Sequence, residues 1–256
     1  MFRLLKLKPP NGWGAVAWEL GIVTLGVLIA LAAQAWAEER GWAGKVAASK
    51  AALRDELAEH YGYAVEYRVV YPCLQAQVDR LRERLMNSGN VLEPAPIYHE
   101  DERSGSGIEA DFVLRIPTKY YPSDAWAEAI SDGVVQRFDS AVRRQFAGHY
   151  ASLADITRIS AVNDEDAKAL AALARPLPLD PSVRYALLSR IEGLDGRLQW
   201  LDIQNGQVID YIERIGMVPE PAAAQALAVR YGTYQFCKAQ RLPVRPFKEA
   251  MTAVPN

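Results

Sequence analysis

Three histidines and two cysteines are the side chains of this 256-residue chain that are best suited to chemistry. His60 lies four positions after Glu56 and directly after Glu59. The di-metal sites of helical bundles use a Glu-x-x-His spacing, which requires a carboxylate at the position of Leu57. We therefore predict that His60 is a hydrogen-bonded histidine at a helix interface and that it binds no metal.

A second imidazole begins the run His99-Glu100-Asp101-Glu102. Loop carboxylates of this kind can bind a hard cation, but a charged run beside glycines is more typical of a solvated loop. The chain also lacks the motifs of a nucleophile elbow, a zinc protease, a phosphate-binding loop and a dinucleotide-binding turn. We predict no metal, no cofactor and no catalytic residue.

The two cysteines, Cys73 and Cys237, form a candidate disulfide. An even number of cysteines suits an oxidising compartment. In the chain-entropy model, closing so long a loop stabilises a fold by roughly 5 kcal/mol. The alternative is a pair of buried thiols that pack as small apolar side chains.

The most apolar stretch of the chain lies near its N-terminus, between Trp18 and Trp36. At a helical rise of about 1.5 Å per residue this interval spans roughly 27 Å, close to the ~30 Å hydrocarbon core at whose edges indole rings prefer to lie. We predict a transmembrane helix over residues 15–37, with Trp18 and Trp36 as membrane-interface anchors. The alternative is a cleaved signal peptide, because Ala35-Trp36-Ala37 fits the small-x-small cleavage pattern.

The charges that flank this span predict its orientation. Arg3, Lys6 and Lys8 precede the span, and an excess of basic residues marks the cytoplasmic side. We expect a short cytoplasmic segment at residues 1–14 and an extracytoplasmic, periplasmic domain at residues 38–256 of a bacterial inner-membrane protein. That domain carries 26 basic and 30 acidic residues, and this overall balance gives no electrostatic reason to bind nucleic acid or an anionic membrane surface.

Small residues repeat along one face of the predicted span. They are Gly26, Ala30, Ala33 and Ala37. Such a face lets transmembrane helices approach closely, and it is a candidate for self-association or for contact with a protein partner. Glycine and alanine are also common in anchors that do not associate.

Two long segments show the alternating four-and-three spacing of heptad repeats, from Val46 to Leu85 and from Leu187 to Ile215. Pro72 lies within the first segment and predicts a kink or break there. One chain can pair two such helices by returning on itself, so we predict an all-α fold in which the transmembrane helix continues into an antiparallel helical bundle. The alternative is a homodimeric stalk. The polar Asn205 is expected to fix the register of the second helix.

Local signals predict the rest of the domain. Residues 87–122 are rich in glycine and proline and are expected to be irregular, with a short strand at residues 111–116. The further expected elements are a helix at residues 124–131 capped by Ser123, a helix from Val134 to about Ser160, a short helix capped by Asn163, and a last helix from Ala222 to about Gln240. The second heptad helix is expected to start at Asp180-Pro181 and to end at Gly216, which Pro219 and Pro221 follow.

Three tyrosines, Tyr63, Tyr67 and Tyr71, recur every four residues on the first heptad helix. They could form an aromatic platform for a ligand. Packing between helices is the interpretation that we favour.

The N-terminal region carries a family resemblance. Leu5 to Leu57, with Trp18-Glu19-Leu20, the run from Gly26 to Leu31 and Gln34-Ala35-Trp36, resembles uncharacterised bacterial inner-membrane proteins that have one N-terminal span and a helical extracytoplasmic domain. Ala125-Trp126 followed by Gly133 is also similar to that group. The resemblance implies an anchor, a topology and a helical fold, but no activity.

Together these patterns predict a non-enzymatic membrane protein whose extracytoplasmic helical domain binds or scaffolds a protein partner. A ligand-sensing ectodomain that acts through a membrane partner is the first alternative. A periplasmic enzyme of unfamiliar type is the second.

Overall fold

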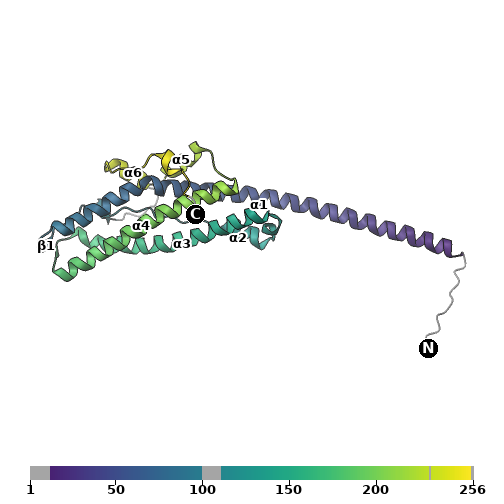
Figure 1. Ribbon diagram of the computed structural model, residues 1–256, viewed down its shortest axis with the longest axis horizontal. Helices are drawn as coiled ribbons and strands as arrows, with labels where there is room; N and C mark the ends of the chain where they lie inside the picture. The colour runs from purple at the N-terminus through teal and green to yellow at the C-terminus, as the bar shows by residue number, and fades with distance from the viewer. Residues whose placement is uncertain (1–11, 100–110, 231, 255–256) are drawn as a thin grey trace, which may run out of the picture. The chain divides into compact units, whose positions relative to one another are not determined.

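The computed structural model describes residues 12–99, 111–230 and 232–254. Of these residues, 78% are helical and 3% are in strands, so the predicted helical character is confirmed (Figure 1). The chain divides into two compact units, Met1–Ala51 and Ala52–Asn256. The division falls later than residue 37, where the sequence predicts the end of the span, because one helix continues through both positions.

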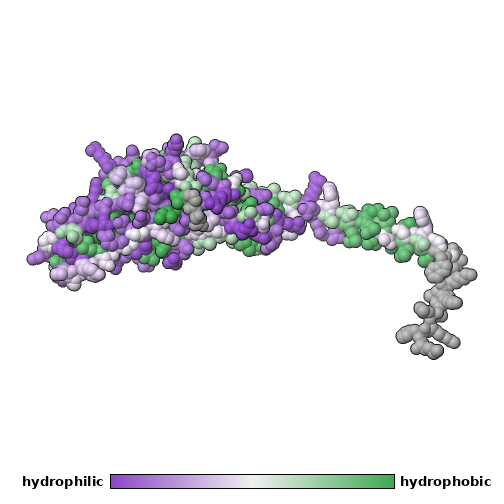
Figure 2. Space-filling view, in the orientation of Figure 1, coloured by the Kyte–Doolittle hydropathy of each residue, from purple (hydrophilic) through white to green (hydrophobic). Residues whose placement is uncertain are grey.

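The first unit contains the N-terminal part of helix α1 (Gly12–Asn87). This part is long and apolar enough to cross a membrane, and its apolar stretch is not buried. Figure 2 shows the apolar side chains that follow one another along it. Trp18 and Trp36 are 72% and 64% exposed, and the four small residues of the predicted association face are exposed as well. Residues 1–11, with the three basic residues that predict orientation, lie outside the described residues.

In the second unit, α1 is buried on every side between His60 and Tyr71. The heptad positions from Leu53 to Leu85 are buried, but so are Tyr61, Gly62, Tyr63 and Val65, which lie outside that pattern. A helix that is covered all round needs partners on more than one face. The heptad pattern identified only one of these faces.

Helices α3 (Ser140–Leu170) and α4 (Pro181–Ile215) supply one set of partners and run antiparallel to each other (Figure 1). Near one end Gly148 lies against Tyr211, and near the other Arg197 donates from Nε to Asn163 Oδ1 at 2.7 Å. The predicted heptad positions of α4 are buried from Ile191 onward, including Leu194, Leu198, Leu201, Asn205, Val208 and Ile212.

Two predictions about α3 are wrong. The helix begins at Ser140, because Asp139 caps it by accepting from Ala141 N at 2.7 Å; residues Val134–Arg137 form a separate 3₁₀ turn, η2. Asn163 begins no helix. Its side chain accepts a hydrogen bond from Arg197 of α4, and α3 continues past Asn163 to Leu170.

The predicted break at Pro72 is also absent, since α1 is continuous from Gly12 to Asn87. A proline inside a helix disturbs the carbonyl groups of the preceding turn. The carbonyl of Val69 lies in that turn and accepts a hydrogen bond from Arg245 N at 2.8 Å. The C-terminal part of the chain therefore satisfies a backbone group beside the proline.

Three short strands lie in the segment predicted to be irregular, and they take part in two small antiparallel pairs. Strand β1 (Val91–Leu92) pairs with β4 (Leu177–Pro178), which follows the turn η3 (Ala171–Ala174). Strand β2 (Tyr98–His99) pairs with β3 (Asp111–Phe112). The strand predicted at residues 111–116 is thus shorter than expected, and β2 is its partner.

Helix α4 starts and ends where local signals predict. Asp180 accepts from Ser182 N at 2.8 Å and from Val183 N at 2.9 Å, and Pro181 occupies the first turn. Gly216 ends the helix with a φ of 77°, a left-handed conformation that glycine adopts without strain. Arg184 donates to the carbonyls of Ser88 at 2.8 Å and Gly89 at 2.7 Å, just beyond the end of α1.

The last predicted helix is divided into α5 (Pro221–Val229) and α6 (Gly232–Ala239), followed by the short α7 (Phe247–Ala250). Cys73 of α1 and Cys237 of α6 are joined by a disulfide, with their Cα atoms 6.0 Å apart. Helix α5 approaches α1 so closely that a Cβ at Gly62 would lie 2.5 Å from Leu227. The C-terminal helices therefore cover a further face of α1.

Candidate functional site

A groove of about 500 Å³ lies between the middle of α3, helix α2 (Asp124–Ser131) and the residues before α2. Its lining is dominated by aromatic and aliphatic side chains, which are Tyr120, Tyr121, Trp126, Ile130, Tyr150 and Leu153. Ser123 and Thr157 add hydroxyl groups. Tyr120 is 71% exposed and Ile130 is 54% exposed. Large apolar side chains are thus presented to solvent around a concave surface.

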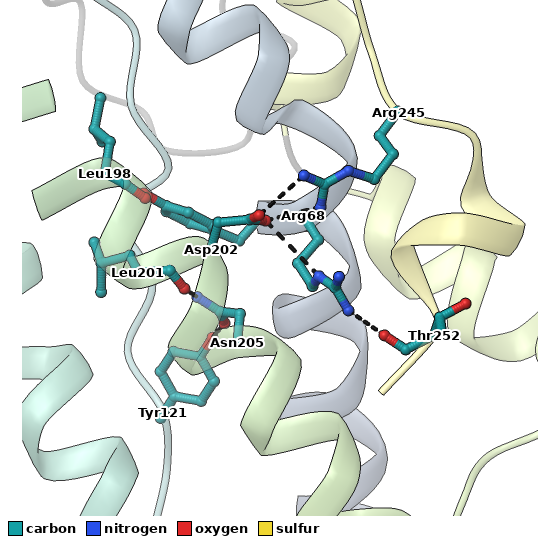
Figure 3. A network of polar contacts seen from close by, with 9 residues as sticks. Arg68, Tyr121, Leu198, Leu201, Asp202, Asn205, Arg245 and Thr252 are labelled. Atoms are coloured by element: carbon teal, nitrogen blue, oxygen red, sulfur yellow. Dashed lines mark hydrogen bonds and ion pairs between the residues drawn. The ribbon is translucent and has the colours of Figure 1, made fainter. Parts of the chain in front are cut away.

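The aromatic walls of the groove are held by neighbours on both sides. Trp126 of α2 stacks on Phe146 and on Tyr150 of α3, each with ring centroids 5.2 Å apart. Tyr121 donates its hydroxyl to Asn205 Oδ1 of α4 at 2.7 Å, and Asn205 Nδ2 donates to Leu201 O at 2.8 Å (Figure 3). The phenol of Tyr121 therefore points into the core, and its ring faces the groove.

Glu56 of α1 holds two further parts of the site. One carboxylate oxygen accepts from the hydroxyl of Tyr150, and the other accepts from Ala125 N at 2.9 Å. Burial and the Glu56 carboxylate raise the pKa of Tyr150, so its phenol stays protonated and remains a donor. Ser123 precedes α2, but it makes no side-chain capping bond. Ser123 occupies the predicted N-cap position and α2 spans the predicted residues 124–131, but Glu56 satisfies a first-turn N–H of α2 in place of the Ser123 hydroxyl.

Behind the groove lies a buried pair of histidines, His60 of α1 and His149 of α3. His60 Nδ1 is 2.9 Å from His149 Nε2, and His60 Nε2 is 2.7 Å from the carbonyl oxygen of Pro122. A carbonyl only accepts, so His60 Nε2 carries its proton, His60 Nδ1 accepts, and His149 Nε2 donates. His149 Nδ1 is then an acceptor with no hydrogen-bond partner in the described structure.

Burial keeps this pair neutral. It lowers the pKa of His60 from 6.5 to about 4, although the hydrogen bond to Pro122 opposes the shift. Burial and the neighbouring His60 also lower the pKa of His149 well below its usual range. The surroundings are the rings of Tyr121, Tyr150 and the more distant Tyr211. The pair therefore joins α1, α3 and the residues before α2 without carrying charge at neutral pH.

The histidine pair predicts a specific pH dependence of stability. Unfolding exposes imidazoles that bind protons near pH 6.5, whereas the folded pair resists protonation. The free energy of unfolding is thus expected to be highest above pH 6.5 and to fall as pH drops toward 4, with His60 alone contributing about 3 kcal/mol. Denaturant titrations of the full chain at several pH values check this.

The matched variant is His149→Gln, whose amide can still donate to His60 Nδ1. One titrating group is then lost while the hydrogen bond is kept. The slope of stability against pH between 6.5 and 5 is expected to fall by about half. An unchanged slope in this variant would show that other groups control the pH dependence.

A second polar network fastens the C-terminal residues to α1 and α4 (Figure 3). Asp202 of α4 accepts from both terminal nitrogens of Arg245, at 2.8 and 2.9 Å. The same carboxylate lies 3.7 Å from Arg68 Nε. Arg68 also donates to the carbonyl of Thr252. Two guanidinium groups thus share one largely buried carboxylate.

Another buried ion pair, separate from the Asp202 network, lies on a different face of α1. Lys119 Nζ is 2.9 Å from Glu66 Oε2, and the Glu66 side chain is fully buried. Burial raises the pKa of Glu66, and the attraction of Lys119 opposes that rise. This pair connects the residues before α2 to the central helix.

A larger hollow of about 660 Å³ lies near the C-terminal end of α1. Side chains of both charges line it, including Arg80, Glu83 and Glu93. Its other lining residues include Tyr98 and Val113, which flank the segment 100–110 that lies outside the described residues. Its lining is mainly charged and polar, whereas the groove beside α2 combines packed aromatic walls with exposed apolar side chains.

The structure brings together some of the residues that the sequence singled out. His60 packs against the groove-lining rings of Tyr121 and Tyr150, and Asn205 accepts a hydrogen bond from the hydroxyl of Tyr121. The tyrosines Tyr63, Tyr67 and Tyr71 are each 7% exposed and pack in the core. The acidic run after His99 lies outside the described residues, and among the described residues no group of three or more metal-ligating side chains gathers.

Sequence reasoning did not find the groove itself. The available signals were Tyr120-Tyr121-Pro122, a pair of aromatic residues before a helix start, and the i, i+4 pair Trp126 and Ile130 on an eight-residue helix. Tyr150 carried no distinguishing signal, because its role depends on α2 and α1 lying beside α3.

The family models that were scanned do not match this chain, and searches of curated proteins and of solved structures found no significant similarity.

Proposed function

We propose that this protein is a non-enzymatic, membrane-anchored binding module of the bacterial cell envelope. In this proposal residues 15–37 cross the inner membrane once, residues 1–14 are cytoplasmic, and the helical domain of residues 38–256 is an antiparallel bundle in the periplasm. The groove beside α2 then takes an apolar segment of a protein partner. The anchor is supported by the apolar stretch of α1, which is unburied and lies in a helix long enough to cross a membrane.

The binding role rests on a difference between the groove and the polar groups behind it: the groove has exposed apolar side chains, whereas the polar groups are hydrogen-bonded to one another. The groove presents Tyr120 and Ile130 to solvent beside the ring of Trp126. The nearby groups that could do acid–base chemistry are engaged with one another, in the His60–His149 pair and in the Glu56–Tyr150 hydrogen bond. An exposed apolar surface around rigid aromatic walls suits association.

Blue native electrophoresis of solubilised membranes tests the binding role. The wild-type chain is expected to migrate as a complex larger than one chain, and Tyr120→Ser with Ile130→Ser is expected to release it, because both residues are exposed on the groove. The matched control is Tyr185→Ser with Ile203→Ser, two exposed residues of α4 that lie outside the groove lining. Equal migration of the two double variants would contradict the proposal.

The anchor and its orientation are tested by a C-terminal alkaline phosphatase fusion. The basic residues before the span predict a periplasmic C-terminus, so the fusion is expected to be active and a cytoplasmic fluorescent reporter at the same site dark. The opposite pattern would reverse the topology. Mature protein that begins at Glu38 would replace the anchor with a signal peptide.

A ligand-sensing ectodomain is the second candidate, favoured by the groove volume of about 500 Å³. Pockets for small molecules fall in this range. A sensor of this kind would transmit its signal through a membrane partner. Small-molecule binding to the purified chain that Ile130→Ser abolishes, without any protein complex in membranes, would favour this role.

A further inference from the structure

Two tryptophan–cation pairs follow the apolar stretch of α1. The guanidinium of Arg40 lies 5.2 Å from the ring centroid of Trp36, and the ammonium of Lys45 lies 5.2 Å from that of Trp42. The two pairs have spacings of i, i+4 and i, i+3, so each joins neighbouring turns of one helix face. Each pair places a ring N–H donor and a positive charge close together.

The pairs lie where the headgroup layer would begin if residues 15–37 fill the hydrocarbon core. Arg40 is about 4.5 Å, Trp42 about 7.5 Å and Lys45 about 12 Å beyond Ala37 along the helix axis. Each headgroup layer is roughly 5–7 Å thick, so the backbone of the second pair lies at or beyond its outer edge. Side chains of a helix tilt toward its N-terminus. Arg40 and Lys45 therefore reach back toward the bilayer.

The helix also presents the two pairs on different faces. Six residues separate Trp36 from Trp42, which corresponds to about 240° of helical rotation at 3.6 residues per turn. Lipids on different sides of the helix can therefore each contact one of the two pairs. Two carboxylates, Glu38 and Glu39, share this turn with Arg40, and Glu38 accepts a hydrogen bond from the neutral Gln34 Nε2 at 2.8 Å.

We propose that Trp36, Arg40, Trp42 and Lys45 form a headgroup-binding collar that binds the phosphate of anionic phospholipids. The cation attracts the phosphate, and the adjacent indole lies at the interface and offers its N–H. This inference rests on the proposed membrane anchor. It adds that the part of α1 just outside the membrane selects which lipids lie next to it.

The test uses the full chain reconstituted in phosphatidylcholine vesicles that contain a trace of spin-labelled phosphatidylglycerol or of spin-labelled phosphatidylcholine. Electron spin resonance measures how strongly each label associates with the protein. A basic residue near an anionic membrane surface raises the association constant roughly fivefold. The wild-type chain is expected to prefer phosphatidylglycerol by about that factor or more, and less so at high salt.

In the double variant Arg40→Gln with Lys45→Gln, the ratio of phosphatidylglycerol to phosphatidylcholine association is expected to fall close to one. The matched control, Lys50→Gln with Arg54→Gln, removes two cations farther along the same helix and is expected to keep the preference. Trp36→Phe with Trp42→Phe is expected to weaken the preference, because the rings remain but the N–H donors are lost.

The outcomes separate the collar from the anchor. A chain that floats with the vesicles but associates equally with both labels overturns the collar and leaves the anchor standing. Equal losses in the two cation variants also overturn the collar, because general attraction would then explain the preference. A chain that does not float with the vesicles overturns both.

Discussion

Replacing both cysteines, as Cys73→Ala with Cys237→Ala, is expected to lower the free energy of unfolding of the helical domain by about 5 kcal/mol. The disulfide closes a loop with a sequence separation of 164 residues, so its removal frees a large part of the unfolded chain. Both cysteines are fully buried. Denaturant unfolding of the full chain in detergent, followed by near-ultraviolet circular dichroism, measures the loss.

The control for this experiment separates the crosslink from the packing of sulfur. Cys73→Val with Cys237→Val fills more of the same volume but forms no bond. The valine variant is expected to lose nearly as much stability as the alanine variant. If valine restores most of the stability, core packing accounts for the effect and the loop-closure explanation is wrong.

Asp202→Asn is expected to cost about 3 kcal/mol or more. The substitution keeps the size of the side chain but removes the one carboxylate that Arg68 and Arg245 share. The side chains of these two arginines are 9% and 20% exposed, so both charges would be left poorly solvated. Breaking a buried ion pair from one side typically costs 3–5 kcal/mol. The same unfolding assay measures the loss.

The matched control is Asp79→Asn, which removes a carboxylate from the exposed ion pair with Arg82. Asp79 is 58% exposed, and Arg82 keeps Glu192 and Asp195 as partners. Exposed pairs typically contribute less than about 1 kcal/mol. Similar losses for Asp79→Asn and Asp202→Asn would contradict the importance given to the buried network.

Features of this fold that depend on a few neighbouring residues could be predicted from the sequence. The Asp180 cap and the Gly216 stop lie beside the helix they define, and the apolar positions of α4 repeat with one period. The burial of α1 on all sides could not be predicted. It depends on the C-terminal part of the chain, where Leu227 of α5 approaches Gly62 and the backbone N–H of Arg245, between α6 and α7, donates to the carbonyl of Val69.

The candidate site shows the same limit. Sequence reasoning correctly expected His60 to be hydrogen-bonded, because its position in the heptad pattern indicated a helix interface. Its partner His149 is 89 residues away, and no periodicity connects them. Ser123 lies at the N-cap position of α2 as predicted, but the side chain that accepts from the first turn is Glu56 of a distant helix. Tertiary contacts decided each of these cases.

Site-specific photocrosslinking in native membranes tests the central claim most directly. A benzoylphenylalanine placed at Ile130, on the groove, is expected to form a discrete adduct with another protein. The same residue at Tyr185, which is 75% exposed on α4, is expected to form none. Absence of an adduct at Ile130, or the same adduct from both positions, would contradict the account of the groove as the surface that binds a partner.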